Sequence, residues 1–120
     1  MSSFINNLLY FTSQSFLTNG AGENTNVSVT SSLLLVTPLT DQDFISGFIP
    51  QQTPDGAILW VMNVDTVKTL LLKSPGNSTA GFQVVLPVGF ATMTLEPGDS
   101  ALLTYTLGVG WRPLSIGALT

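Results

Sequence analysis

The sequence predicts an all-β protein with a jelly-roll-like antiparallel sandwich of about eight strands. Three observations predict this fold. Short runs alternate between apolar and polar side chains, as around Phe82, Val84 and Leu86, and a period of two is typical of strands with one buried face. Turn sequences rich in glycine, proline, asparagine and aspartate separate these runs at intervals of about 8 to 12 residues. No stretch carries a convincing helical pattern of apolar residues.

The composition indicates one domain whose surface is partly covered by another protein. The chain has 120 residues, the length of a single domain with its own core. Only 8% of its residues are charged, against about 25% in an ordinary soluble domain, and its mean hydropathy is +0.42. Disorder does not explain this, because disordered chains are poor in apolar residues. Since large apolar surfaces left in water aggregate, we expect them to be buried in an assembly.

Charge and residue content exclude several classes of function. Seven acidic and three basic residues give a net charge of −4, so attraction to nucleic acid phosphates is weak and no nucleic acid partner is expected. The longest apolar run, residues 57–62, is far shorter than the roughly 20 residues that cross a membrane. The chain has no cysteine and no histidine, which removes thiolate chemistry and the commonest general base and metal ligand. We therefore expect no enzymatic activity and no cofactor.

Residues 1–18 are predicted to form an N-terminal arm, extended or with a short helical turn. Its large aromatic and aliphatic residues include Phe4, Leu8, Phe11 and Phe16. The segment lacks the basic region and the continuous apolar region of a signal peptide, yet it is too apolar to remain in water. Either it is the first strand of its own domain, or it lies on a neighbouring subunit. Residues 19–120 then form the β-sandwich domain.

The central strands are predicted from apolar runs. Residues 27–37 are expected to form one strand that begins with alternation and ends buried on both faces. Residues 57–64 and 67–72 flank Asp65 and Thr66, so they form either a hairpin or a pair joined at a sheet corner. Both runs are apolar on both faces, which is typical of strands that contact the core on one side and a partner on the other.

The C-terminal stretch, residues 82–116, contains the clearest turns. The sequence EPGD at 96–99 is a tight turn with proline and glycine in its central positions. Residues 108–110 are a short glycine-rich hairpin loop that leads into Trp111. Alternation on either side of these turns predicts three strands, and no reactive group lies near them, so we interpret the stretch as a scaffold.

Two aspartates give a weak signal of a metal site. Asp41 and Asp43 could begin a calcium site, because oxygen ligands from alternate residues of a loop can converge on one ion. No glycine-centred loop of about twelve residues follows them. A solvated turn is therefore the preferred interpretation.

Aromatic residues and the single arginine are the remaining candidates for binding. The aromatic set Trp60, Trp111, Tyr10 and Tyr105 forms either a sugar-stacking platform or, in the preferred interpretation, anchors in the core or at an interface. Arg112 is the only arginine, and it is a candidate contact to a carboxylate of a partner.

Four sequence segments carry a resemblance to a known class of protein. They are TPDGAILWVMNVD, TVKTLLLK, Phe82 with VVLP, and TLEPGDSALLTYTLGVGWRPLS, all within residues 50–116. Their order resembles small jelly-roll domains of tailed-bacteriophage virions, which occur in capsid decoration (cement) proteins and in fibre or tip proteins, usually as trimers. Thr106 stands where many fibre-type copies have an aspartate.

The resemblance implies a structural virion protein on the capsid surface, a homotrimeric cement protein that binds and stabilises the outer surface of a phage capsid. Its partners would be further copies of itself and the major capsid protein. The alternative is the receptor- or glycan-binding head of a phage fibre, and a small hydrolase is the least supported reading because histidine is absent. The residues predicted at the trimer or capsid interface are Phe4, Leu8, Phe11, Phe16, Trp60, Met62, Leu70, Leu72, Trp111 and Arg112.

Overall fold

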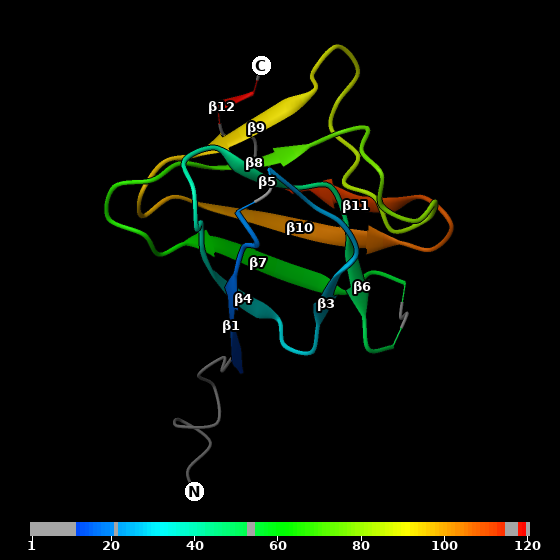
Figure 1. Ribbon diagram of the computed structural model, residues 1–120. Coiled ribbons are helices and arrows are strands. Elements are labelled where there is room, and N and C mark those ends of the chain that lie inside the picture. The colour runs from blue at the N-terminus through cyan, green and yellow to red at the C-terminus, as the bar shows by residue number, and fades with distance from the viewer. Residues whose placement is uncertain (1–11, 21, 53–54, 115–117, 120) are drawn as a thin grey trace, which may run out of the picture.

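The structure contains strands and no helix among the residues that it describes (Figure 1). It is a computed structural model, and it describes residues 12–20, 22–52, 55–114 and 118–119. The all-β prediction is confirmed. The twelve strands are β1 (Ser13–Leu17), β2 (Glu23–Asn24), β3 (Val27–Val29), β4 (Leu33–Thr37), β5 (Asp43–Ile45), β6 (Phe48–Pro50), β7 (Ile58–Asn63), β8 (Leu70–Lys73), β9 (Thr92–Leu95), β10 (Ser100–Thr106), β11 (Gly110–Pro113) and β12 (Ala118–Leu119).

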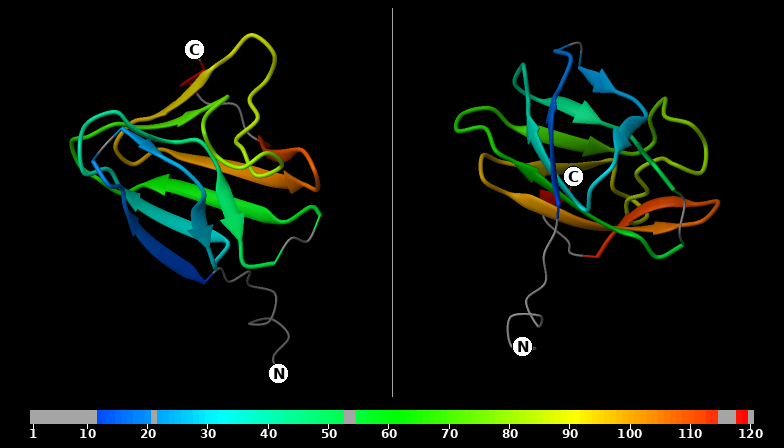
Figure 2. Two further views of the ribbon diagram at one scale, coloured as in Figure 1. Left: turned by 45° about the vertical axis from the view of Figure 1, so that its right-hand side comes forward. Right: turned by 90° about the horizontal axis from the view of Figure 1, so that it is seen from below.

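The strands form three sheets around a shared core. The first sheet has the order β1-β4-β7-β10-β11, the second has the order β12-β9-β8-β5-β2, and the third contains β3 and β6. Two five-stranded sheets with a buried interior agree with the predicted sandwich. The short third sheet lies beside β7 and closes one side of the interior (Figure 2).

The chain from β1 to β8 winds as a coil, with each strand beside the strand one turn later. Ser13 pairs with Leu33, and Leu33 in turn pairs with Trp60, so β1, β4 and β7 run parallel. The second sheet repeats this pattern with β2, β5 and β8, and the third sheet with β3 and β6. Five of the nine strand pairs are therefore parallel, where an antiparallel sandwich was expected. Alternation and turn spacing predict strands, but they do not say which strand lies beside which.

Tight corners turn the coil from one sheet to the next. Asn26 has a positive φ of 51° between β2 and β3, a backbone conformation that asparagine tolerates better than most residues. Gly47 lies between β5 and β6, where an added Cβ would come within 2.6 Å of the Phe82 carbonyl oxygen. Only glycine fits this position without displacing the neighbouring backbone.

Two predicted strands have different bounds in the structure. Residues 27–37 are divided into β3 and β4, because Thr30, Ser31 and Ser32 turn the chain from the third sheet to the first. Residues 82–86 form only isolated bridges, from Gln83 to Gly47 and from Val84 to Trp111. Serine and threonine occur both in strands and at corners, so the sequence of residues 30–32 does not distinguish a corner from a continuous strand.

The C-terminal strands are antiparallel and follow the predicted turns. At the predicted turn 96–99 the Asp99 N–H donates to the Glu96 carbonyl at 2.8 Å, and Gly98 has a φ of 87°. At the hairpin between β10 and β11 the Val109 N–H donates to the Thr106 carbonyl at 3.0 Å. The runs on either side of residues 65–66 meet at a sheet corner, since β7 belongs to the first sheet and β8 to the second.

Side chains of alternating residues meet in rows inside the sandwich. In the first sheet, Leu34 of β4, Val61 of β7 and Ala101 of β10 are adjacent in register and buried. In the second sheet, Leu72 of β8 lies beside Ile45 of β5, and both are fully buried. One apolar cluster joins residues of all three sheets, so the sheets share a single core.

The predicted arm overlaps the sandwich. Residues 13–17 form β1, the edge strand of the first sheet, and Phe16 packs against the core. The alternative in which this segment is the first strand of its own domain therefore describes residues 13–17. Residues 1–11, with Phe4, Leu8 and Phe11, lie outside the described residues.

Replacing Leu72 by alanine should destabilise the fold. The side chain is fully buried, and removing a buried leucine costs about 2–5 kcal/mol because a cavity remains. Urea unfolding followed by circular dichroism measures the loss. Val67→Ala is the control, since Val67 is 79% exposed in the adjacent corner and should change the free energy of unfolding by less than about 0.5 kcal/mol. An unchanged midpoint for Leu72→Ala would contradict the core position.

Candidate interaction surfaces

The outward side of the first sheet carries aligned apolar side chains, which we call the outer face. Leu33, Trp60 and Leu102 are adjacent in register across β4, β7 and β10, and Leu35 lies beside Met62 in the next row. These five side chains are half-buried. Ile58, which is 38% exposed, completes the outer face. The adjacent apolar residues of the outer face form a stripe on one side of the sheet.

The structure separates the predicted interface residues into two groups. Trp60 and Met62 lie on the outer face, and Arg112 is exposed on β11 opposite Thr104. This position fits the predicted role of Arg112 as a contact residue. Phe16 points the other way, toward the core.

Three predicted interface residues are buried in the core instead. Leu70 and Leu72 are fully buried on the inner side of β8, and Trp111 is 2% exposed. They cannot contact another subunit while the protein is folded, so their assignment to an interface was wrong. The run TVKTLLLK is apolar at successive positions, so periodicity does not tell the inner side from the outer one.

Sequence reasoning missed Leu33, Leu35 and Leu102 of the outer face. Leu33 and Leu35 lie in the continuous run LLLV, where alternating residues point to opposite sides of the sheet. The available signal was their even spacing opposite the buried Leu34 and Val36. This spacing identifies the outward residues only once the structure shows to which side of the sheet one residue of the run points.

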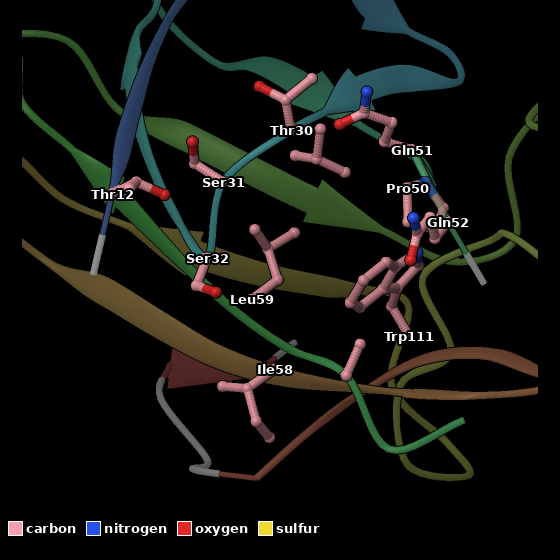
Figure 3. Close-up of a pocket in the computed structure, with 12 residues that line it drawn as sticks. Thr12, Thr30, Ser31, Ser32, Pro50, Gln51, Gln52, Ile58, Leu59 and Trp111 are labelled. Atoms are coloured by element: carbon pink, nitrogen blue, oxygen red, sulfur yellow. The ribbon is translucent and has the colours of Figure 1, made fainter. Parts of the chain in front are cut away.

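An open groove of about 260 Å³ lies at one end of the first sheet, beside the third sheet (Figure 3). The hydroxyls of Ser31 and Ser32 and the side-chain amides of Gln51 and Gln52 line its sides, and Leu59 lies at its base. None of the twelve described residues that line the groove is charged. Its chemistry suits a neutral polar group.

The aromatic residues do not form a joint sugar-stacking platform. Trp111 and Tyr105 are each 2% exposed, and their ring centroids lie 5.2 Å apart in the core. Trp60 lies on the opposite side of the first sheet, since its neighbour Leu59 points inward. The core-anchor interpretation is confirmed for Trp111 and Tyr105, while Tyr10 lies outside the described residues.

The two aspartates considered for calcium bind different partners. Asp41 accepts a hydrogen bond from the Thr69 N–H at 2.8 Å. Asp43 is 1% exposed, so the solvated-turn interpretation was wrong for this residue. Its Oδ2 accepts from the Thr18 hydroxyl at 2.6 Å and from the Thr40 N–H at 3.0 Å, and its Oδ1 accepts from the Thr40 hydroxyl. In the described part of the chain no group of three or more aspartate, glutamate, histidine or cysteine residues could hold a metal ion.

The environment of Asp43 favours its ionised form. Burial by itself disfavours the charge, but the hydrogen bonds from Thr18 and Thr40 together outweigh burial and hold the pKa of Asp43 below its ordinary value. Asp43 therefore fastens the end of β1, through Thr18, to the corner that precedes β5. Its role is structural.

The chain matches no model of a known protein family, and no curated protein is significantly similar to it. The described residues also contain no helix long and apolar enough to cross a membrane.

Replacing Asp43 by asparagine should lower stability most at neutral pH. The folded protein has the lower pKa for this group, so its contribution is present above the unfolded value of about 3.9 and is lost as the pH falls through the folded value. We expect a loss of about 1–3 kcal/mol at pH 7 and a smaller difference from the wild type below pH ~3. Urea titrations across this range measure both.

The control is Asp55→Asn, which changes an exposed carboxylate in the turn before β7. Its Oδ1 accepts a hydrogen bond from the Leu107 N–H at 2.9 Å, and the asparagine oxygen can accept the same bond. It should lie within about 0.5 kcal/mol of the wild type at neutral pH. A stability difference for Asp43→Asn that stays constant from pH 7 to pH 3 would rule out the proposed ionisation.

Proposed function

We propose that this protein is a homotrimeric structural protein of a phage virion, a cement protein that binds and stabilises the outer surface of the capsid. The outer face is the observation that carries the proposal. It presents aligned apolar side chains on the opposite side of the first sheet from the core. The resemblance of residues 50–116 to small phage jelly-roll domains supports the same assignment.

In this proposal the outer face contacts neighbouring copies within the trimer. Burying apolar area contributes about 25 cal/mol per Å² before the entropic costs of association, and rows that are already rigid in a sheet lose little conformational entropy on binding. The apolar stripe is uncharged, so copies of one chain meet there without like-charge repulsion. Arg112 lies on the same side of the sheet and supplies a polar contact at the edge of the interface.

The contact with the major capsid protein is assigned to the N-terminal residues, including Phe4, Leu8 and Phe11. They precede Thr12, whose carbonyl accepts a hydrogen bond from the Leu33 N–H at the edge of the first sheet. The chain thus enters the sandwich beside the outer face. This arrangement lets one subunit contact both its neighbours and the shell.

The groove favours a second candidate function, the glycan-binding head of a phage fibre. Its hydroxyl and amide side chains match the hydrogen-bonding groups of neutral sugars. No exposed aromatic ring among the described lining residues faces the groove, since Trp111 is buried. Binding to a panel of neutral glycans, together with failure to bind shells, would favour this second function over the first.

Replacing Leu33 and Leu102 together by glutamine should weaken assembly. The two residues flank Trp60 in one row of the outer face, and each buried leucine contributes about 1.5–3 kcal/mol. We expect a self-association constant at least about tenfold weaker, since 1.4 kcal/mol is a factor of ten. Sedimentation equilibrium measures it, and co-sedimentation with capsids that lack the protein measures shell binding.

Leu107→Gln is the matched control, because it makes the same change at a leucine that is 61% exposed in the loop between β10 and β11, away from the outer face. It should leave the trimer intact. The proposal would be overturned if the wild-type protein stayed monomeric at about 100 μM and did not bind undecorated capsids. At this concentration even weak complexes, with a binding free energy of about −5 to −6 kcal/mol, are populated.

A further inference from the structure

In the first turn of the coil, three strands each have one edge that pairs with no other strand. These are the outer edges of β1, β2 and β3, each of which pairs with only one other strand. Sheet edges present free backbone N–H and C=O groups, and proteins usually protect them. In this protein the three edges differ in how they are protected.

The edge of β3 is covered by the side chain of Gln14. Its Nε2 donates to the Ser28 carbonyl at 2.8 Å, and its Oε1 accepts from the Thr30 N–H at 2.8 Å. One carboxamide thus takes the place of a neighbouring peptide group. The edge of β2 is only two residues long, and very short edge strands are poor templates for pairing.

The edge of β1 has no such protection. Thr12 and Thr18 bond to β4, through the Leu33 N–H and the Thr37 carbonyl, so the intervening odd-numbered residues direct their backbone groups away from β4. These residues are Ser13, Ser15 and Leu17, and no hydrogen-bond partner for their outward groups is found among the described residues. The sequence of β1, SQSFL, contains no charge and no proline, the usual devices that block an edge.

We propose that β1 pairs with β1 of a second copy of this chain, in an antiparallel ladder about a two-fold axis at Ser15. The three outward residues are evenly spaced about Ser15, so Ser15 lies opposite its own copy and Ser13 lies opposite Leu17 in both directions. Each of these opposite pairs exchanges both of its hydrogen bonds. No backbone group of the outward edge then remains unpaired.

The chemistry of β1 fits a second copy. In a self-paired strand, a charged side chain would lie close to the same charge on the second copy, and this repulsion would weaken the pairing. Ser13 and Ser15 are exposed and small, so their side chains allow the two backbones to approach. Leu17 is 58% exposed and lies on the outward side of the sheet, where Leu35 is adjacent to Ser15.

The pairing joins two first sheets into one continuous sheet. Both outer faces then lie on the same side of the joined sheet, because rotation about a two-fold axis normal to a sheet does not exchange its two sides. This contact uses the sheet edge and leaves the outer face available, so it is independent of the trimer contact proposed above. Its loss and the loss of the trimer are distinguishable by the variants that cause them.

A single cysteine at Ser15 tests the register. The chain has no cysteine of its own, and directly opposite residues of a hydrogen-bonded pair lie about 5.5 Å apart at Cα, within the roughly 4.4–6.8 Å that a disulfide spans. Ser15→Cys should form a disulfide-linked dimer under mild oxidation. Ser13→Cys is the matched control, because four residues at about 3.4 Å each separate it from its own copy, and it should remain unlinked.

A proline at Ser15 tests the backbone contact. The Ser15 N–H points away from β4, so Ser15→Pro removes an outward donor and keeps the ladder to β4. We expect dimerisation through β1 to weaken at least tenfold by sedimentation equilibrium, with an unchanged circular dichroism spectrum. The amides of Ser13, Ser15 and Leu17 in the wild type should exchange more slowly as protein concentration rises.

Three results would overturn the proposal. Equal cross-linking of Ser13→Cys and Ser15→Cys would show that the contact has no fixed register. Protection of the three amides that does not change with concentration would show that a segment of the same chain occupies the edge. Rapid exchange at every concentration, with no cross-link at Ser15, would show that the edge stays free.

Discussion

The buried indole of Trp111 joins the coiled and antiparallel parts of the protein. Its Nε1–H donates to the Phe48 carbonyl at 2.8 Å, and its backbone N–H donates to the Gln83 carbonyl at 2.8 Å. Its ring meets Phe48 edge-on at 6.0 Å and Tyr105 at 5.2 Å. A buried N–H without an acceptor costs about 1–3 kcal/mol, so β6 and β11 are held at one separation. The end of the sandwich beside the groove depends on this contact.

Buried polar side chains hold the corners at which the apolar core is thin. Asn63 is fully buried, and its Nδ2 donates to the Lys68 and Leu95 carbonyls at 2.9 Å each, which ties the end of β7 to β9 and to the corner before β8. Ser46 and Ser78 share a hydrogen bond of 2.8 Å beneath the loop that carries Gly76. These residues fix the path of the chain between sheets, because an unsatisfied buried group would oppose any alternative path.

Sequence reasoning predicted the features that depend on neighbouring residues. The turn at 96–99 and the hairpin at 108–110 each follow from local backbone chemistry, and the structure contains both. For residues 65–66 the sequence left a hairpin and a sheet corner open, and the structure has the corner. The parallel coil was not predictable in this way, because it pairs residues that are far apart in the chain, such as the buried Leu34 and Val61. The outer face was predicted in part, through Trp60 and Met62. Leu70 and Leu72 were assigned to the wrong side, since an unbroken apolar run does not reveal which residues point inward.

The open first turn of the coil has a consequence for the dynamics of the native state. Each of β1, β2 and β3 pairs with one other strand only, whereas β4 and β7 have a partner strand on both sides. In coiled architectures each turn contributes an interface with the next turn, and terminal turns have one interface fewer. We therefore expect the segment from β1 to β3 to open at a free energy below that of global unfolding.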